Sequence, residues 1–120
     1  MTSEELEKYL ESIGGLILSY KDKKITRFGV EDGWNQLIHD LVEELIQSGW
    51  DKKISQVKEK FGGLRFYIEN GNIEFNKIIS KYENLSYAIC ETCGKPGEID
   101  KSKGWLKTVC EEHKILRNEK

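Results

Sequence analysis

The sequence of 120 residues predicts an α+β fold, in which helices pack on a small antiparallel β-hairpin sheet and a cysteine-containing module follows. Apolar residues recur at helical spacing in three segments, and an alternating strand pattern surrounds Gly62-Gly63. All three cysteines lie beyond residue 89. We therefore expect an α+β body over residues 1–86 and a module over residues 87–120, together forming one compact domain.

The first helix is predicted to begin at a capping box, Thr2-Ser3-Glu4-Glu5, and to end at Gly14-Gly15. Its apolar positions are Leu6, Tyr9, Leu10 and Ile13. Residues 16–31 leave two alternatives open, because Leu16-Ile17-Leu18 fits either a buried strand or a further helical turn. Residues 21–24 are interpreted as a solvated turn.

The second helix has the most regular pattern, with Asp32 as the predicted N-cap and Gly49 at the C-terminal end. Its apolar stripe consists of Leu37, Ile38, Leu41, Val42, Leu45 and Ile46. Its polar face carries His39, Asp40, Glu43, Glu44 and Gln47. We interpret His39 as a solvent-exposed helix position rather than as a metal ligand or a catalytic group.

A β-hairpin is predicted over residues 54–69, closed by a two-residue loop at Gly62-Gly63. This register sets Phe61 opposite Leu64 and Val57 opposite Ile68 on the apolar face. The other face carries Lys58, Lys60, Arg65 and Tyr67. Asn70-Gly71-Asn72 ends the strand, and a third helix is then predicted from Phe75, Ile78, Ile79, Tyr82 and Leu85.

Charge is unevenly distributed along the chain. The formal net charge is −2, and residues 1–50 hold five Lys/Arg against ten Asp/Glu. This balance argues against a dedicated nucleic-acid-binding protein, so direct nucleic-acid binding is not expected. The candidate contact for a positively charged protein is the acidic face formed by Asp40, Glu43 and Glu44, together with Glu4, Glu7 and Glu11.

The basic hairpin face is open to two interpretations. Lys58, Lys60 and Arg65, beside Phe66 and Tyr67, form a basic and aromatic pattern typical of single-stranded nucleic-acid binding. The favoured interpretation is a solvated face with Phe66 in the core. No apolar stretch is long enough to cross a bilayer and no signal peptide is evident, so we expect a cytoplasmic protein without a membrane partner.

The cysteines and a histidine have the spacing of a metal site: Cys90-x2-Cys93, sixteen residues, then Cys110-x2-His113. Four such ligands suit tetrahedral zinc, and a set closed by protein side chains is structural rather than catalytic. A knuckle at residues 90–94, a hairpin pairing residues 98–100 with 105–109, and a helix starting near Cys110 predict a treble-clef-like zinc module. The alternative is a redox pair, Cys90 and Cys93, but the β-α-β pattern that usually accompanies one is missing.

No nucleophile–base pair, phosphate-binding loop or paired-carboxylate motif stands out, and a closed zinc site leaves no position for an activated water. We therefore expect a protein that is not an enzyme.

Three stretches together have a familiar form: Phe28-Gly29-Val30-Glu31-Asp32-Gly33-Trp34 leading to Leu37-Ile38, residues 56–68, and the run from Ile89 to His113. They resemble small zinc-binding proteins encoded by tailed bacteriophages and prophages. The resemblance covers residues 28–113 and carries the metal ligands over to Cys90, Cys93, Cys110 and His113 alone.

Within that family, the chain is similar to a metalloprotein described as an anti-CRISPR. This resemblance implies direct binding to the host's type II-A CRISPR effector nuclease, which would block target-DNA loading in the bacterial cytoplasm. The alternative is a zinc-stabilised phage protein that binds nucleic acid as an accessory or regulator. For the nuclease, the candidate partner contacts are Asp40, Glu43 and Glu44 on the acidic face, or Lys58, Lys60 and Arg65 on the hairpin.

Overall fold

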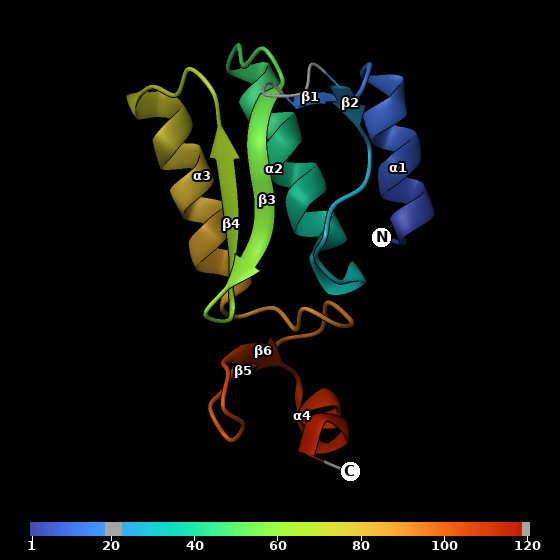
Figure 1. Cartoon of the computed structure of the whole chain (residues 1–120), viewed down its shortest axis with the longest axis vertical. Coiled ribbons are helices and arrows are strands. Elements are labelled where there is room, and N and C mark those ends of the chain that lie inside the picture. Colours follow the sequence, from blue (N-terminus) through green and yellow to red (C-terminus); the bar gives the residue numbers. More distant parts are fainter. Residues whose placement is uncertain (19–22, 119–120) are drawn as a thin grey trace.

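The computed structural model describes residues 1–18 and 23–118. Figure 1 shows an elongated molecule, with a body at one end and a smaller C-terminal module at the other. The body contains α1 (Ser3–Ser12), β1 (Leu16–Leu18), β2 (Lys23–Ile25), the 3-10 helix η1 (Asp32–Trp34), α2 (Asn35–Gln47), β3 (Lys53–Lys60), β4 (Gly63–Ile68) and α3 (Ile73–Ser86). The module contains β5 (Glu98–Asp100), β6 (Lys107–Val109) and α4 (Glu111–Asn118). The α+β class predicted from the sequence is confirmed.

The sheet of the body is larger than predicted and is mixed rather than purely antiparallel. Its strand order is β2-β1-β3-β4, and β1 runs parallel to β3. The predicted hairpin supplies only two of these four strands. Leu16–Leu18 forms a third strand, which pairs with Lys53 and Ile54. Lys23 and Lys24 lie in β2 rather than in a turn, and residues 21 and 22 lie outside the described residues.

Both N-terminal helices end as their glycines predict. At the start of α1, the capping box at Thr2 is complete. At the end of α2, the backbone turns back at Gly49, whose φ is +99°. The amide of Trp50 then donates to the carbonyl of Leu45, as in a Schellman motif. The predicted N-cap of α2 is wrong. A 3-10 turn over Asp32–Trp34 precedes the helix, and the Asp32 carboxylate accepts a hydrogen bond from Ser3 instead.

The hairpin closes one residue earlier than predicted. Phe61 and Gly62, with φ of +54° and +88°, occupy the loop, and Lys60 pairs with Gly63. Gly63 is required for close packing, because a Cβ there would lie 2.3 Å from the ring of Tyr87. The register moves by two residues along the partner strand, so each side chain keeps its face of the sheet. Phe61 was expected in the core and is 65% exposed.

The predicted third helix is confirmed as α3, and Asn72 caps its first turn. The helix packs along β4, and its side chains accept hydrogen bonds from backbone amides at the edge of that strand. Leu64 donates to the hydroxyl of Ser86 at 2.9 Å, and Phe66 donates to the carboxylate of Glu83 at 2.9 Å. The free edge of β4 is therefore hydrogen-bonded by side chains of its own chain.

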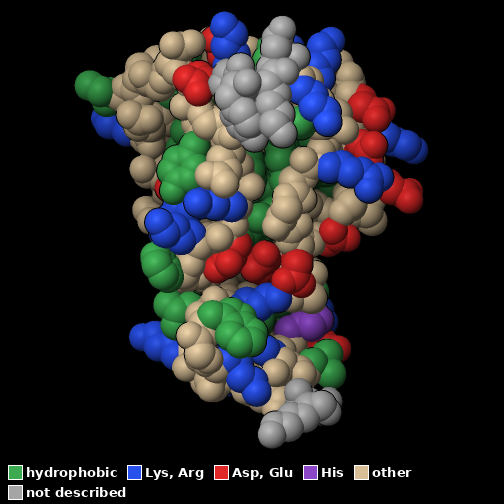
Figure 2. Space-filling view, in the orientation of Figure 1, with side chains coloured by type: hydrophobic (Ala, Val, Ile, Leu, Met, Phe, Trp, Pro, Cys, Tyr) green, Lys and Arg blue, Asp and Glu red, His purple; other side chains and the backbone are tan. Residues whose placement is uncertain are grey.

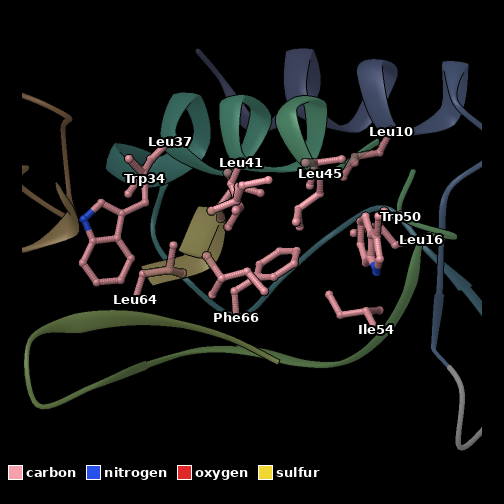
Figure 3. Packing of buried hydrophobic residues seen from close by; sticks show 14 of the residues in the cluster. Leu10, Leu16, Trp34, Leu37, Leu41, Leu45, Trp50, Ile54, Leu64 and Phe66 are labelled. Carbon is pink, nitrogen blue, oxygen red and sulfur yellow. The ribbon is translucent and has the colours of Figure 1, made fainter. Parts of the chain in front are cut away.

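The core lies between the helices and the sheet. Figure 3 shows Leu37, Leu41 and Leu45 of α2 directed toward the strand residues Leu64 and Phe66. Trp34 and Trp50 lie at opposite ends of this row in Figure 3. The apolar stripe predicted for α2 is confirmed, with Ile38, Leu41, Val42 and Leu45 fully buried and Ile46 at its margin. Burial of this stripe is the main apolar contribution that fixes α2 on the sheet.

Candidate metal centre

The structure brings together the four residues that the sequence spacing selected. One ligand atom from each of Cys90, Cys93, Cys110 and His113 lies within 4.8 Å of all the others. The Sγ atoms of Cys93 and Cys110 are 3.7 Å apart. The Nδ1 atom of His113 is 3.7 Å from the Sγ of Cys90 and 3.2 Å from that of Cys110. The four side chains thus form a potential metal-binding group.

These distances fit a tetrahedral zinc ion. Bonds of about 2.3 Å to sulfur and about 2.05 Å to nitrogen put two sulfurs about 3.8 Å apart, and a sulfur and a nitrogen about 3.6 Å apart. The observed separations lie close to these values. Three thiolates and one imidazole are also a donor set that zinc prefers over hard cations. The residues present are therefore consistent with zinc.

Two local structures position the ligands. Cys90 and Cys93 lie in a tight turn, where the amide of Gly94 donates to the carbonyl of Cys90 and that of Cys90 donates to the carbonyl of Lys95. Gly94 has a φ of +83°, which favours glycine. Cys110 immediately precedes α4 and His113 lies in its first turn, so both face the turn from a helix N-terminus.

The expected hairpin between the two ligand pairs is present but shorter than predicted. Residues Glu98–Asp100 pair with Lys107–Val109, whereas Trp105 and Leu106 lie outside the strand. The guanidinium of Arg117 holds this loop, donating to the Asp100 carboxylate at 2.7 Å and to the carbonyl of Trp105. The module therefore has one buried ion pair besides its metal-binding group.

Amide groups around Cys90 favour its thiolate form. Burial alone raises the pKa of the Cys90 thiol, but hydrogen bonds from the backbone of Cys110, Cys93 and Thr92 outweigh that effect. The pKa of the thiol consequently lies below its ordinary value. A thiolate is the form that binds metals, so the fold prepares this sulfur for coordination.

The metal-binding group lies directly against the body at η1. The amide of Gly33 donates to the carbonyl of Glu91 at 2.7 Å, and the indole of Trp34 donates to the carbonyl of Ile89 at 3.0 Å. A Cβ on Gly33 would lie 2.1 Å from the carbonyl oxygen of Cys90. The backbone of η1 is thus in van der Waals contact with the cysteine turn, at the level where Figure 1 shows the module meeting the body.

Glu31 and Thr108 provide further connections. The carboxylate of Glu31 accepts hydrogen bonds from Thr92 and from Lys107, both in the module. The hydroxyl of Thr108 donates to the carbonyl of Gly62 in the hairpin loop at 2.7 Å. The module is therefore attached at η1 and at the β3–β4 turn, in addition to the hydrogen bond that Arg65 of β4 donates to Tyr87. The sequence pattern identified the candidate metal ligands but not these contacts between the module and the body. The adjacent Gly33 and Trp34 were the residues that could have indicated them.

The three acidic residues of α2 that were proposed as a partner surface have partners within the chain. Glu43 accepts a hydrogen bond from Tyr9, Glu44 forms an ion pair with Lys81 at 2.7 Å, and Asp40 contacts His39 at 2.9 Å. The Lys81 ammonium holds the pKa of Glu44 below its ordinary value. Burial, together with the Glu43 carboxylate, raises the pKa of Tyr9 well above its ordinary value.

His39 differs from its predicted environment. Its side chain is 25% exposed and its ring lies 4.3 Å from that of Tyr9, in an edge-to-face arrangement. It is therefore partly covered by α1 rather than solvent-exposed. The four metal-binding side chains lie elsewhere, in the C-terminal module, so the structure does not bring His39 into that group.

The basic residues lie where the sequence places them, on the outer face of the hairpin. Lys58 pairs across the strands with Arg65, and the ammonium of Lys58 lies 5.9 Å from the centre of the Tyr67 ring. Phe66 lies in the core, 2% exposed, as the favoured interpretation required. The aromatic residue of the turn is instead Phe61, which has the Lys60 ammonium 5.5 Å from its ring centre.

Within the described ranges, 1–18 and 23–118, every helix is too short or too polar to cross a bilayer. Comparisons with known proteins add nothing to the fold and the metal-binding group, which rest on the geometry of the chain alone. No family model, no curated protein and no solved structure matches the chain.

Proposed function

We propose that the four side chains hold one structural zinc ion and that residues 87–120 form a treble-clef module around it. The knuckle, the β5–β6 hairpin and the two ligands at the start of α4 follow one another in the order this arrangement requires. Zinc would be bound by Cys90, Cys93, Cys110 and His113. All four positions would then be filled by protein, so zinc would supply folding energy rather than catalysis.

We further propose that the protein is a phage-encoded, non-catalytic inhibitor, which binds a type II-A CRISPR effector nuclease in the bacterial cytoplasm and blocks target-DNA loading. The observation that carries this proposal is the closed set of four ligands, held against the body by Gly33, Glu31 and Thr108. A rigid surface without an open metal position suits a stoichiometric inhibitor. The named target rests on the resemblance of residues 28–113 to zinc-binding phage proteins.

The acidic face on α2 remains our first candidate contact, because such a nuclease carries a positively charged channel for nucleic acid. Its internal hydrogen bonds restrict how this face is tested. Replacing Glu43 or Glu44 by lysine would also disturb Tyr9 or Lys81. The amide variants Asp40→Asn, Glu43→Gln and Glu44→Gln remove charge while keeping an oxygen acceptor at each position.

The decisive experiment titrates the protein into a DNA-cleavage assay with a purified type II-A effector nuclease and guide RNA. Inhibition should saturate at a fixed ratio of protein to nuclease and should not increase with incubation time. The triple amide variant should bind more weakly, with unchanged zinc content and melting temperature. Absence of any complex between the wild-type protein and such nucleases, tested by size-exclusion chromatography, would overturn the proposed function.

A further inference from the structure

Exposed cationic and aromatic side chains lie on the hairpin and again on the β5–β6 loop of the C-terminal module. We name this surface the basic-aromatic strip. Figure 2 shows Lys and Arg side chains beside hydrophobic ones over the hairpin and again over the module, with a row of acidic side chains between the two regions. The strip consists of Lys58, Lys60, Phe61, Arg65 and Tyr67 from β3, β4 and their turn, and of Lys101, Lys103 and Trp105 from the β5–β6 loop.

The two halves of the strip touch each other. A Cβ at Gly62, next to Phe61, would lie 3.6 Å from Leu106 and 3.6 Å from the amide of Lys107. Leu106 directly follows Trp105, so the hairpin turn and the tryptophan loop are neighbours. The hydrogen bond from Thr108 to Gly62 fixes this contact. The two halves of the strip thus meet at this contact, although Phe61 and Trp105 are 44 positions apart in the sequence.

Trp105 is exposed yet held in place. Its side chain is 65% exposed, and the guanidinium of Arg117 lies 5.0 Å from its ring centre. Arg117 is in turn fixed by the buried carboxylate of Asp100. An aromatic ring that is already ordered loses little conformational freedom when a ligand stacks on it. Phe61, also 65% exposed, offers a second apolar ring on the same surface.

The lysines of the strip are not neutralised by nearby acids. Among the described residues, no carboxylate lies within ion-pair distance of Lys58 or Lys60. Of the acids closest in sequence or contact, Glu31 pairs with Lys107, whereas Glu59 accepts a hydrogen bond from the amide of Gly62 and keeps its charge. The acidic face lies on α2, and charges beyond about 8–10 Å are largely screened at physiological salt. A net charge of −2 therefore does not prevent local attraction of an anion.

We infer that the basic-aromatic strip binds single-stranded nucleic acid, with lysines on the phosphates and with Trp105 and Phe61 stacking on bases. Rows of cations alternating with exposed aromatic rings are how proteins bind single strands without reading their sequence. An acidic protein segment would satisfy the lysines but would leave two exposed rings without a planar partner. This inference goes beyond the proposed inhibitor function and does not depend on it.

The distribution of tryptophans supplies a specific probe. Trp34 and Trp50 are 0% and 4% exposed, so a base can stack only on Trp105 among the three. We would titrate the zinc-loaded full-length protein with a fluorescein-labelled oligothymidine of about 20 nucleotides, longer than the usual site size of a single-strand-binding module. Binding is followed by anisotropy, and stacking by quenching of tryptophan emission with unlabelled strand. Oligouridine serves as the RNA probe.

Three variants test the two kinds of contact. Trp105→Ala should weaken binding about tenfold, the loss expected for one stacked base, and Trp105→Phe should restore most of the affinity without the quenching signal. Lys58→Glu with Lys60→Glu should weaken binding and reduce the slope of log affinity against log salt by about 1.4, or about 0.7 per phosphate contact. The matched control, Lys8→Glu with Lys77→Glu, makes the same charge change on exposed lysines of α1 and α3 and should leave the affinity nearly unchanged.

Two results would overturn the inference: no binding of either oligonucleotide by the wild-type protein at low salt, or equal loss of affinity in the control and strip variants. A third would reassign the surface: strip variants that bind the oligonucleotides normally but lose a protein partner would make it a protein contact. Because no nuclease is present in these measurements, their failure leaves the inhibitor proposal standing. Zinc content and melting temperature of each variant separate a binding effect from unfolding.

Discussion

The body and the C-terminal module differ in what holds them together. Among the described residues, sixteen buried apolar side chains form the core of the body, whereas the buried cluster of the module contains only Cys90, Val109 and Cys110. A segment of fewer than about 40 residues rarely buries enough apolar surface to fold without a disulfide or a metal. The comparison indicates that a metal held by the four candidate ligands would take the place of an apolar core in the module.

The two regions are joined through residues close to the metal-binding cysteines. Their interface includes hydrogen bonds to residues beside the metal-binding cysteines: Gly33 and Trp34 donate to the carbonyls of Glu91 and Ile89, and Thr92 donates to the carboxylate of Glu31. Such groups lie close to the metal ligands in the chain, so their positions depend on the ligands being held together. We therefore expect loss of metal to be felt at the interface while the apolar core of the body stays intact.

The largest effect is expected from removing a metal ligand. Cys90→Ser or Cys110→Ser should abolish zinc binding and the cooperative folding of the module, because structural zinc contributes about 10–16 kcal/mol of binding free energy in small zinc modules. Helix α2 should remain protected from hydrogen exchange. Elemental analysis and hydrogen exchange measure the two outcomes. His113→Cys keeps four ligands and is the matched control. Wild-type protein purified without chelator and free of zinc would contradict the proposal.

The next effect tests the apolar core. Leu41→Ala or Leu45→Ala should lower the free energy of unfolding by about 2–5 kcal/mol, since both side chains are fully buried. Urea denaturation followed by tryptophan emission measures the change, and zinc content should stay constant. His39→Ala should cost less, although the contact of His39 with Tyr9 makes its loss measurable. If His39→Ala were the more damaging change, the apolar stripe would not be the main support of α2.

A smaller effect is expected at the interface between the two regions. Gly33→Ala should destabilise the protein by about 1–3 kcal/mol, because the new methyl group would overlap the carbonyl oxygen of Cys90 and the backbone must shift. Gly29→Ala is the matched control, because a Cβ there meets no atom within 4 Å. Thermal unfolding of zinc-loaded protein compares them. Equal melting temperatures would show that close contact at η1 is not needed.

The smallest effect concerns Glu44 and Lys81 on the body surface. The pKa of Glu44 is lowered by Lys81, so the pair stabilises the folded protein above the ordinary carboxyl value of 4.5 and loses that contribution as pH falls below it. Glu44→Gln should be slightly less stable than wild type at pH 7, and the difference should vanish in acid. Urea midpoints at several pH values measure this. A stability difference between Glu44→Gln and wild type that increases at low pH would contradict this prediction.

Local patterns predicted much of this molecule because they depend on near neighbours in the chain. The capping box at Thr2, the stripe on α2 and each of the two pairs of metal-binding residues lie within one or a few helical turns or one tight turn. The ligand spacing was sufficient for the metal-binding group, since a two-residue gap lets both members of a pair reach one ion. Their meeting across 16 residues followed from the predicted intervening hairpin, which the structure contains.

The errors arose where distant contacts decide local structure. The parallel pairing of Leu18 with Ile54 joins segments separated by a whole helix, and no local pattern indicates it. The hairpin turn moved because Gly63 is needed beside Tyr87, which left Phe61 to adopt a positive φ. Asp32 bonds Ser3 rather than capping α2. The sequence indicated the hairpin half of the basic-aromatic strip but not the half on the module, because the loop that carries Trp105 meets the hairpin turn only in the folded chain.

The hydrogen bonds from β4 to Ser86 and Glu83 also limit how this protein can associate with others. A sheet edge with free amides can accept an extended segment of another chain, the mode known as β-augmentation. Here Leu64 and Phe66 already donate to side chains of α3, so a strand arriving at β4 would have to displace them. Recognition of a partner at this edge must therefore depend on side chains and shape, and the same closure protects the sheet from edge-to-edge aggregation.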